Sequence, residues 1–195
     1  MALFSWGKPS APVVTNKVWK TSAARMKGML RECLLAIKAG QTPVVIVWFS
    51  EARETLMHAL TNAGMPTSPG VCVIDASKDL SSLNHLPSGP AAYFWLGRYP
   101  LSAREQDCIN QVRVHHPEAP GHFCLSLEDA VFDVFAGQQL APLLEKLGLR
   151  DDESIEHKLV DKAIDNALQK VSSTVMLERK ATSEKQWFTL NYTAS

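Results

Sequence analysis

Hydrophobic residues recur at helical spacing in three stretches of the first half of the chain, residues 22–40, 51–62 and 101–114. Because apolar residues three or four positions apart share one face of a helix, each stretch predicts an amphipathic helix. Gly40 and Gly64 follow the first two stretches as typical helix stops. In the third stretch, we expect the charged side chains, including Glu105, to face water.

Short runs that are apolar on both faces lie between these helices, at residues 44–49, 71–74, 91–96 and 122–127. Such runs are too short for helices and are typical of central strands in a parallel sheet. Their alternation with amphipathic helices predicts an α/β fold, with a mostly parallel sheet flanked by helices.

Two further amphipathic helices are expected after the last of these strands. The first opens at Ser126 or Glu128, where small polar and acidic groups satisfy free N–H donors and oppose the helix dipole. The second follows the acidic turn at residues 151–154, and its apolar stripe runs from Ile155 to Val171.

Both ends of the chain lack this regularity. Residues 1–16 contain Pro9 and Pro12 and predict an irregular arm, whose Phe4 and Trp6 we expect to pack on the body. Beyond Val171 the helical period is lost. Four apolar residues near the end predict an edge strand that folds back on the sheet: Trp187, Phe188, Leu190 and Tyr192.

Composition narrows the class of protein. The chain has 195 residues, of which 46% are hydrophobic and 21% charged, as in an ordinary globular domain. Its 20 basic and 20 acidic residues cancel, so the overall charge favours neither nucleic acid nor an anionic membrane as a partner. The sequence shows neither a signal peptide nor an apolar run of the ~20 residues that a membrane span needs. We therefore expect a cytoplasmic protein.

Four cysteines are spread along the chain, at positions 33, 72, 108 and 124, without a Cys-x-x-Cys pair. A disulfide or a zinc site is one interpretation of them. Buried reduced thiols are the interpretation that the wide spacing and the apolar surroundings favour.

The sequence resembles a known family in two places. Residues 121–171 contain F-C-L-S-L-E-D, F-A-G, L-L-E-K-L-G and I-E-H-K-L-V-D-K-A-I-D-N-A-L-Q-K-V, in that order. These words resemble the end of the second motor lobe of SecA, the preprotein translocase ATPase, and the start of its scaffold helix. Residues 17–66, with V-W-K-T, K-A-G-Q-T-P-V-V-I-V and S-E-A-R-E-T-L-M-H-A-L-T-N-A-G-M-P, look like the opening of the same lobe.

The resemblance implies a domain plan. After the arm at residues 1–16, residues 17–148 would form a single RecA-like lobe, and residues 149–195 a helical, scaffold-helix-like C-terminal appendage. At residues 76–90 this chain has a short loop where the family carries a longer segment that faces nucleotide. The resemblance therefore indicates a shortened and degenerate lobe.

Motifs for ATP hydrolysis are missing from the sequence. No G-x-x-x-x-G-K-[ST] loop occurs, and the pair Gly7–Lys8 is followed by Pro9. In the family, a Gln and glycine-spaced arginines precede the F-x-L-S-L-E-D words, and the later arginines act as fingers on the transferring phosphoryl group. We therefore compare that stretch with residues 111–121 of this chain.

Gln111 and Arg113 match the opening of the family's motif, but His115, His116 and Glu118 stand where the finger arginines are expected. Imidazole does not replace a bidentate guanidinium, and a carboxylate repels phosphate. The resemblance therefore predicts a pseudo-ATPase lobe without catalytic activity of its own.

Vestigial binding residues are the remaining candidates for a site. Arg98 follows the strand at 91–96, where open α/β sheets place ligands, so a residual ATP or ADP contact would use Gln111, Arg113 and Arg98. The alternative is that Arg98 is a turn residue and Arg113 an ordinary surface residue. No other cofactor and no metal are expected, because the spacing of the histidines and Glu118 matches no closed four-ligand set.

Three functions stay open from the sequence. The first is a non-catalytic SecA-like module that binds or regulates a protein partner, such as SecA itself or a translocon component, in protein export. The second is an incomplete nucleotide-binding subunit that completes an ATP site with a partner chain. The third is an unrelated interaction scaffold that kept only the fold.

Overall fold

The computed structural model describes residues 14–67, 70–135, 146 and 150–192. Its centre is a five-stranded sheet in which every neighbouring pair is parallel, in the order β1-β5-β4-β2-β3. The strands are β1 (Thr15–Trp19), β2 (Thr42–Val47), β3 (Cys72–Asp75), β4 (Ala91–Leu96) and β5 (Gly121–Ser126). The predicted α/β class is confirmed, and the fold is consistent with a RecA-like lobe.

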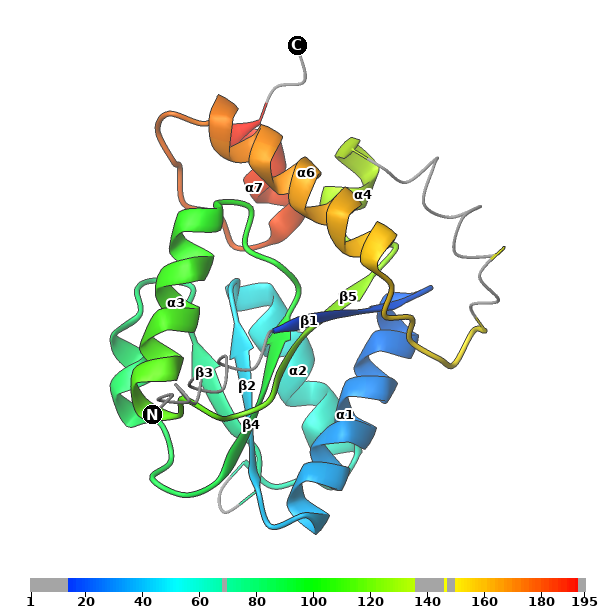
Figure 1. Cartoon of the computed structure of the whole chain (residues 1–195), viewed down its shortest axis with the longest axis vertical. Coiled ribbons are helices and arrows are strands. Elements are labelled where there is room, and N and C mark those ends of the chain that lie inside the picture. The colour runs from blue at the N-terminus through cyan, green and yellow to red at the C-terminus, as the bar shows by residue number, and fades with distance from the viewer. Residues whose placement is uncertain (1–13, 68–69, 136–145, 147–149, 193–195) are drawn as a thin grey trace, which may run out of the picture.

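Helices flank the sheet on both faces (Figure 1). They are α1 (Ser22–Lys38), α2 (Ser50–Asn62), α3 (Ser102–His115), α4 (Ala130–Phe135), α6 (Lys158–Thr174) and α7 (Glu184–Asn191), and the connection between β3 and β4 contains a 3₁₀ turn, η1 (Ser81–His85). Apolar residues of α1 and α2 pack in one core cluster, and those of α3, α4, α6 and α7 pack in the other.

The central strands are buried on both faces, as the sequence predicts. Along β4, Tyr93 and Trp95 enter the cluster that contains α3, while Phe94 and Leu96 enter the cluster that contains α1. Alternate side chains of a strand point to opposite faces, so a strand covered on both faces reads as one continuous apolar run. Strand β1 was missed because it lies at the edge of the sheet and its first three residues are polar, which leaves only Val18 and Trp19 as an apolar signal.

Both predicted helix starts after β5 are wrong by a few residues. Helix α4 begins at Ala130, because the Asp129 carboxylate accepts hydrogen bonds from the Ser126 N–H, at 2.9 Å, and from the Ser126 hydroxyl, at 3.0 Å. These bonds hold a turn before the helix. Helix α6 begins at Lys158, because Ile155 is used in an antiparallel bridge to Val18.

The expected edge strand near the end of the chain is wrong. The segment forms the helix α7, whose cap residue Ser183 accepts a hydrogen bond from the Gln186 N–H at 3.3 Å. Trp187 and Phe188 are buried in the same cluster as the sheet residues. A capping serine therefore outweighed the high strand propensity of the aromatic residues. Phe4, Trp6, Gly148 and most residues of the F-A-G and L-L-E-K-L-G words lie outside the described residues.

A close approach between α1 and β1 fixes one side of the sheet. Trp19, at the end of β1, keeps only 2% of its surface exposed and lies against Gly28 in the middle of α1. A Cβ at Gly28 would lie 2.5 Å from the Trp19 Nε1 atom. The glycine is therefore required by packing, since helices otherwise disfavour it.

We predict that Gly28→Ala destabilises the fold. The usual gain of about 0.5–1 kcal/mol from replacing a helix glycine is reversed here by the clash with a buried indole ring. We expect a net loss of about 1–3 kcal/mol in the free energy of unfolding, measured by urea denaturation. Gly89→Ala is the control, because a Cβ there meets nothing within 4 Å. Equal stability of the Gly28→Ala variant and the wild type would contradict the packing account.

Candidate functional site

The carboxyl ends of all five strands meet at one edge of the sheet, which is where α/β proteins commonly bind ligands. Side chains of the C-terminal helices reach this edge. Residues of α6 and α7 contact the segments that follow β4 and β5 through the groups described below, and Figure 1 shows α6, α7 and α4 gathered at this end. The candidate site is therefore an interface between the sheet edge and the C-terminal segment.

Arg98 is the most heavily bonded side chain of this edge. Its guanidinium binds both carboxylate oxygens of Glu105, with N···O distances of 2.7 to 2.9 Å, and donates to the Asn16 side-chain oxygen at 2.9 Å. It also reaches Asp165 of α6 at 3.4 Å and lies 4.3 Å from the centre of the Phe123 ring. Arg98 thus ties together β1, β5, α3 and α6.

Glu105 is buried, contrary to the prediction that it faces water. Only 3% of the residue is exposed, and its carboxylate also accepts a hydrogen bond from the Tyr99 N–H at 3.0 Å. Burial of a carboxylate is tolerated when a paired charge and hydrogen bonds replace water. The turn that carries Arg98 and Tyr99 supplies both.

A second cluster joins α7 to the start of α4. The Glu184 carboxylate accepts hydrogen bonds from the N–H groups of Ala130, at 3.0 Å, and Val131, at 3.3 Å. Beside it, Asp129 is 6% exposed and pairs with Arg25 of α1 at 2.5 Å. Burial raises the pKa of both carboxyl groups, and the charge of Asp129 raises that of Glu184 further, to about 8.

A third contact holds the loop between α6 and α7. The Glu178 carboxylate accepts hydrogen bonds from the Tyr99 hydroxyl and, at 2.6 Å, from the Trp187 indole N–H. Arg104 donates to the Tyr99 hydroxyl at 3.0 Å and to the Ala76 carbonyl at 2.6 Å. All three clusters therefore lie where the C-terminal segment meets the carboxyl ends of the strands.

The structure places the predicted binding residues in two separate regions. Arg98 binds Glu105 near the start of α3, whereas Gln111 and Arg113 lie in its last turns. At a rise of ~1.5 Å per residue, they lie roughly 9–12 Å farther along the helix axis than Glu105. Gln111 is exposed and lines a hollow of about 490 Å³ together with Asn84. The nucleotide contact of the three residues stays a prediction.

Two of the histidines that were considered for a metal site, His116 and His122, have separate partners. His116 is hydrogen-bonded to the Pro87 carbonyl at 2.7 Å, and His122 is hydrogen-bonded to the Thr15 hydroxyl at 2.7 Å. Burial lowers the pKa of His122. In the part of the chain that the structure describes, no three His, Cys, Asp or Glu side chains form a group that could hold a metal ion.

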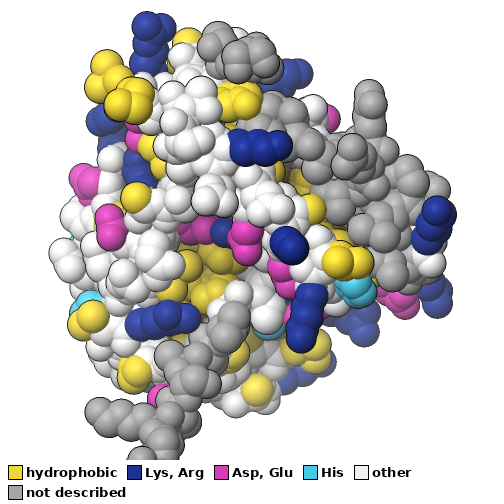
Figure 2. Space-filling view, turned by 45° about the horizontal axis from the view of Figure 1, so that its top comes forward, with side chains coloured by type: hydrophobic (Ala, Val, Ile, Leu, Met, Phe, Trp, Pro, Cys, Tyr) yellow, Lys and Arg dark blue, Asp and Glu magenta, His cyan; other side chains and the backbone are white. Residues whose placement is uncertain are grey.

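The four cysteines are free thiols, and all except Cys72 are buried. Burial raises the pKa of Cys33 to about 12 and that of Cys108 to about 11. Because the thiolate is the reactive form, these groups are poor nucleophiles at neutral pH. On the face shown in Figure 2, basic and acidic side chains are interspersed, without a wide patch of one sign.

Sequence reasoning found Arg98 but missed the residues that complete the three clusters. Asp129 stands in the F-C-L-S-L-E-D words, which could have marked it as a residue of the strand-to-helix turn. Glu184 lies more than fifty positions from its partners Ala130 and Val131, and no local pattern points to it. Its role depends on the tertiary fold.

The fold and this edge define an α/β lobe with a C-terminal helical segment packed on it. Comparison with known proteins finds local similarity to SecA proteins. The chain is 45% identical to the protein translocase subunit SecA of Syntrophobacter fumaroxidans over 58 residues, which are 30% of this chain and 7% of that protein. It is 47% identical to SecA of Psychrobacter cryohalolentis over 58 residues, 30% of this chain and 6% of that protein.

SecA of Acinetobacter baumannii is 45% identical over 51 residues, 26% of this chain and 6% of that protein. The matches therefore span less than a tenth of the relatives' length, and no protein-family model matches the chain. One region of this chain is thus related to SecA. Within the described residues, no helix is long and apolar enough to cross a membrane.

We predict that Arg98→Ala destabilises the protein strongly, because it leaves the buried Glu105 carboxylate without its charged partner. Removal of one member of a buried pair typically costs about 3–5 kcal/mol, and we expect a loss of that size in the free energy of unfolding. The matched control is Arg150→Ala. The Arg150 side chain is 71% exposed, so its ion pairs with Asp152 and Glu153 should contribute at most about 1 kcal/mol. Similar losses in the two variants would contradict the role of Arg98.

A second prediction concerns pH. The pKa of Glu184 is raised from 4.5 to about 8 in the folded protein, so the folded state holds a proton that the unfolded state has lost. Its contribution to stability is therefore fully present below pH ~4.5 and is lost as the pH rises toward 8. Glu184→Gln removes this titration. The variant should gain stability relative to the wild type between pH 5 and 8, measured by chemical denaturation; a constant difference would contradict the prediction.

Proposed function

We propose that this chain is a non-catalytic, SecA-related module that binds or regulates a protein partner in protein export. The observation that carries the proposal is that a SecA-related region belongs to a chain whose candidate phosphate-binding arginine, Arg98, is committed to internal ion pairs. Such an arrangement keeps the lobe's structure and uses its ligand edge for the chain's own C-terminal segment.

The absence of catalysis is supported by the motifs. The chain carries no phosphate-binding loop, and His115 and His116 replace the arginines that would neutralise a transferring phosphoryl group. Arg98 cannot take over this task without leaving Glu105 buried and unpaired. We therefore propose a pseudo-ATPase lobe that acts through binding.

The proposed partner is a protein of the export machinery, either SecA itself or a component of the translocon. This step rests on the similarity of one region to SecA, since a fold does not by itself define a function. The alternative of an incomplete nucleotide-binding subunit would need Arg98, Gln111 and Arg113 at one phosphate. Arg98 lies in the turn before α3, whereas Gln111 and Arg113 lie in the last turns of that helix, so their placement gives this alternative no support.

We predict that the purified chain changes the ATPase or translocation rate of SecA in a saturable way, while the chain alone does not hydrolyse ATP. Arg113→Ala separates the alternatives. A binding module without nucleotide chemistry should keep its full effect in this variant, whereas a subunit that completes an ATP site should lose it. No change in either rate at a saturating concentration of the wild-type chain would contradict the proposed function.

A further inference from the structure

The two outer strands of the sheet, β1 and β3, differ in how the chain covers their free sides, which are called the β1 edge and the β3 edge below. At the β1 edge, Val18 exchanges both of its backbone hydrogen bonds with Ile155, at 3.1 and 2.9 Å. At the opposite edge, β3 pairs only with β2 among the described residues. The β1 edge is therefore bridged at Val18 by the protein's own backbone, whereas the described part of the chain places no strand on the outer side of β3.

The backbone groups that face the open edge follow from the hydrogen bonds at the ends of β3. The Ala76 N–H donates to the Val47 carbonyl of β2, so residues 72, 74 and 76 bond to β2, and residues 71, 73 and 75 face outward. The Val71 N–H donates to the Pro66 carbonyl, and the Asp75 carbonyl accepts from the Ser82 hydroxyl at 2.7 Å.

Between these two closed ends lies an open segment of the edge. It contains the N–H and carbonyl of Val73 and the N–H of Asp75. The Val71 carbonyl faces the same side, but Val71 is fully buried. No hydrogen-bond partner for these groups is found among the described residues. Exposed edges of this kind are templates for strand pairing. Strand β3 carries neither Lys nor Pro, and its length of four residues limits such pairing to a few hydrogen bonds.

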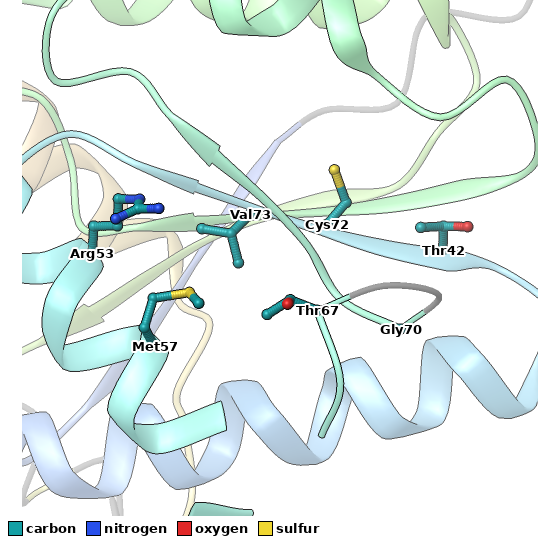
Figure 3. Close-up of a pocket in the computed structure, with 7 residues that line it drawn as sticks. All are labelled: Thr42, Arg53, Met57, Thr67, Gly70, Cys72 and Val73. Atoms are coloured by element: carbon teal, nitrogen blue, oxygen red, sulfur yellow. The ribbon is translucent and has the colours of Figure 1, made fainter. Parts of the chain in front are cut away.

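A pocket of about 440 Å³ lies beside this segment (Figure 3). Met57 and Arg53 of α2 line it from the helix side, and Val73 and Cys72 line it from the strand. The Val73 side chain points toward Met57 in Figure 3, so the pocket offers apolar surface at the middle of the open edge. Arg53 lies 3.8 Å from Asp75, and their charges offset each other.

We propose that the β3 edge binds an extended peptide segment of a partner protein as an additional strand of the sheet. The outward groups of Val73 and Asp75 bond the peptide backbone, and one apolar peptide side chain enters the pocket between Val73 and Met57. Backbone pairing supplies affinity that depends little on sequence, and the pocket selects for an apolar residue. The proposal rests on the proposed binding function and specifies the chemistry of the partner.

The test uses a capped heptapeptide of alternating Thr and Val, titrated into the ¹⁵N-labelled full chain and followed by NMR. We expect the amide signals of Val73 and Asp75 to shift, and their hydrogen exchange to slow at least tenfold, as the peptide pairs with them. The control peptide has the same side chains but is N-methylated at every internal amide, so it should bind at least about fivefold more weakly, the size expected for one lost hydrogen bond.

Two variants locate the site on the protein. Val73→Pro removes the outward N–H and leaves the β2 bonds of residues 72 and 74 in place, which suits an edge position. It should weaken peptide binding about fivefold. Val73→Ala keeps the N–H and serves as the backbone control, with a smaller loss through the pocket alone. The methylated peptide tests the wild-type chain, so the conclusion does not depend on the folding of the proline variant.

Three results would overturn the proposal. The first is equal binding of the two peptides, and the second is a set of NMR shifts that map away from β3. The third is protection of the β3 amides by self-association of the chain without peptide, which would assign the edge to a second copy. Because the peptides are free of SecA, an effect on SecA without peptide binding would remove the strand proposal alone. Peptide binding without an effect on SecA would remove only the proposed role in export.

Discussion

The buried contact between Arg98 and Glu105 is the interaction on which the rest of the structure depends. Arg98 follows β4, and Glu105 lies on α3, so their ion pair fixes the helix against the sheet. The same guanidinium reaches Asn16 of β1 and Asp165 of α6. Because a buried carboxylate needs a charged partner, this group cannot turn toward a ligand without a large loss of stability. A nucleotide contact of Arg98 would therefore compete with stability for one side chain.

That competition explains how the C-terminal segment relates to the ligand edge. In an open α/β sheet, the carboxyl ends of the strands form the usual binding crevice. Here α7 places the Glu184 carboxyl group at the first N–H groups of α4, and its pKa of about 8 keeps it largely protonated at neutral pH. A carboxyl group of the chain itself thus accepts the hydrogen bonds of these N–H groups at the ligand edge. The open β3 edge lies at the outer end of the sheet.

Sequence reasoning predicted the fold well where local physics decides it. The run at 91–96 and the period at 22–40 gave β4 and α1, because burial on two faces or on one stripe leaves a direct trace in the order of residues. Glu105 and Glu184 could not be placed, because their partners are distant in sequence or depend on tertiary packing. The end segment was misread because aromatic residues favour strands, whereas a serine cap and burial of Trp187 decided for a helix.

We propose that this chain acts by binding a protein of the export machinery and not by handling nucleotide. Isothermal titration calorimetry tests it most directly, with the purified chain titrated in one experiment with SecA and in another with ATP and Mg²⁺. We expect a saturable complex between the chain and SecA and no heat of binding between the chain and ATP. Tight binding of ATP to the isolated chain, together with no complex with SecA, would contradict it.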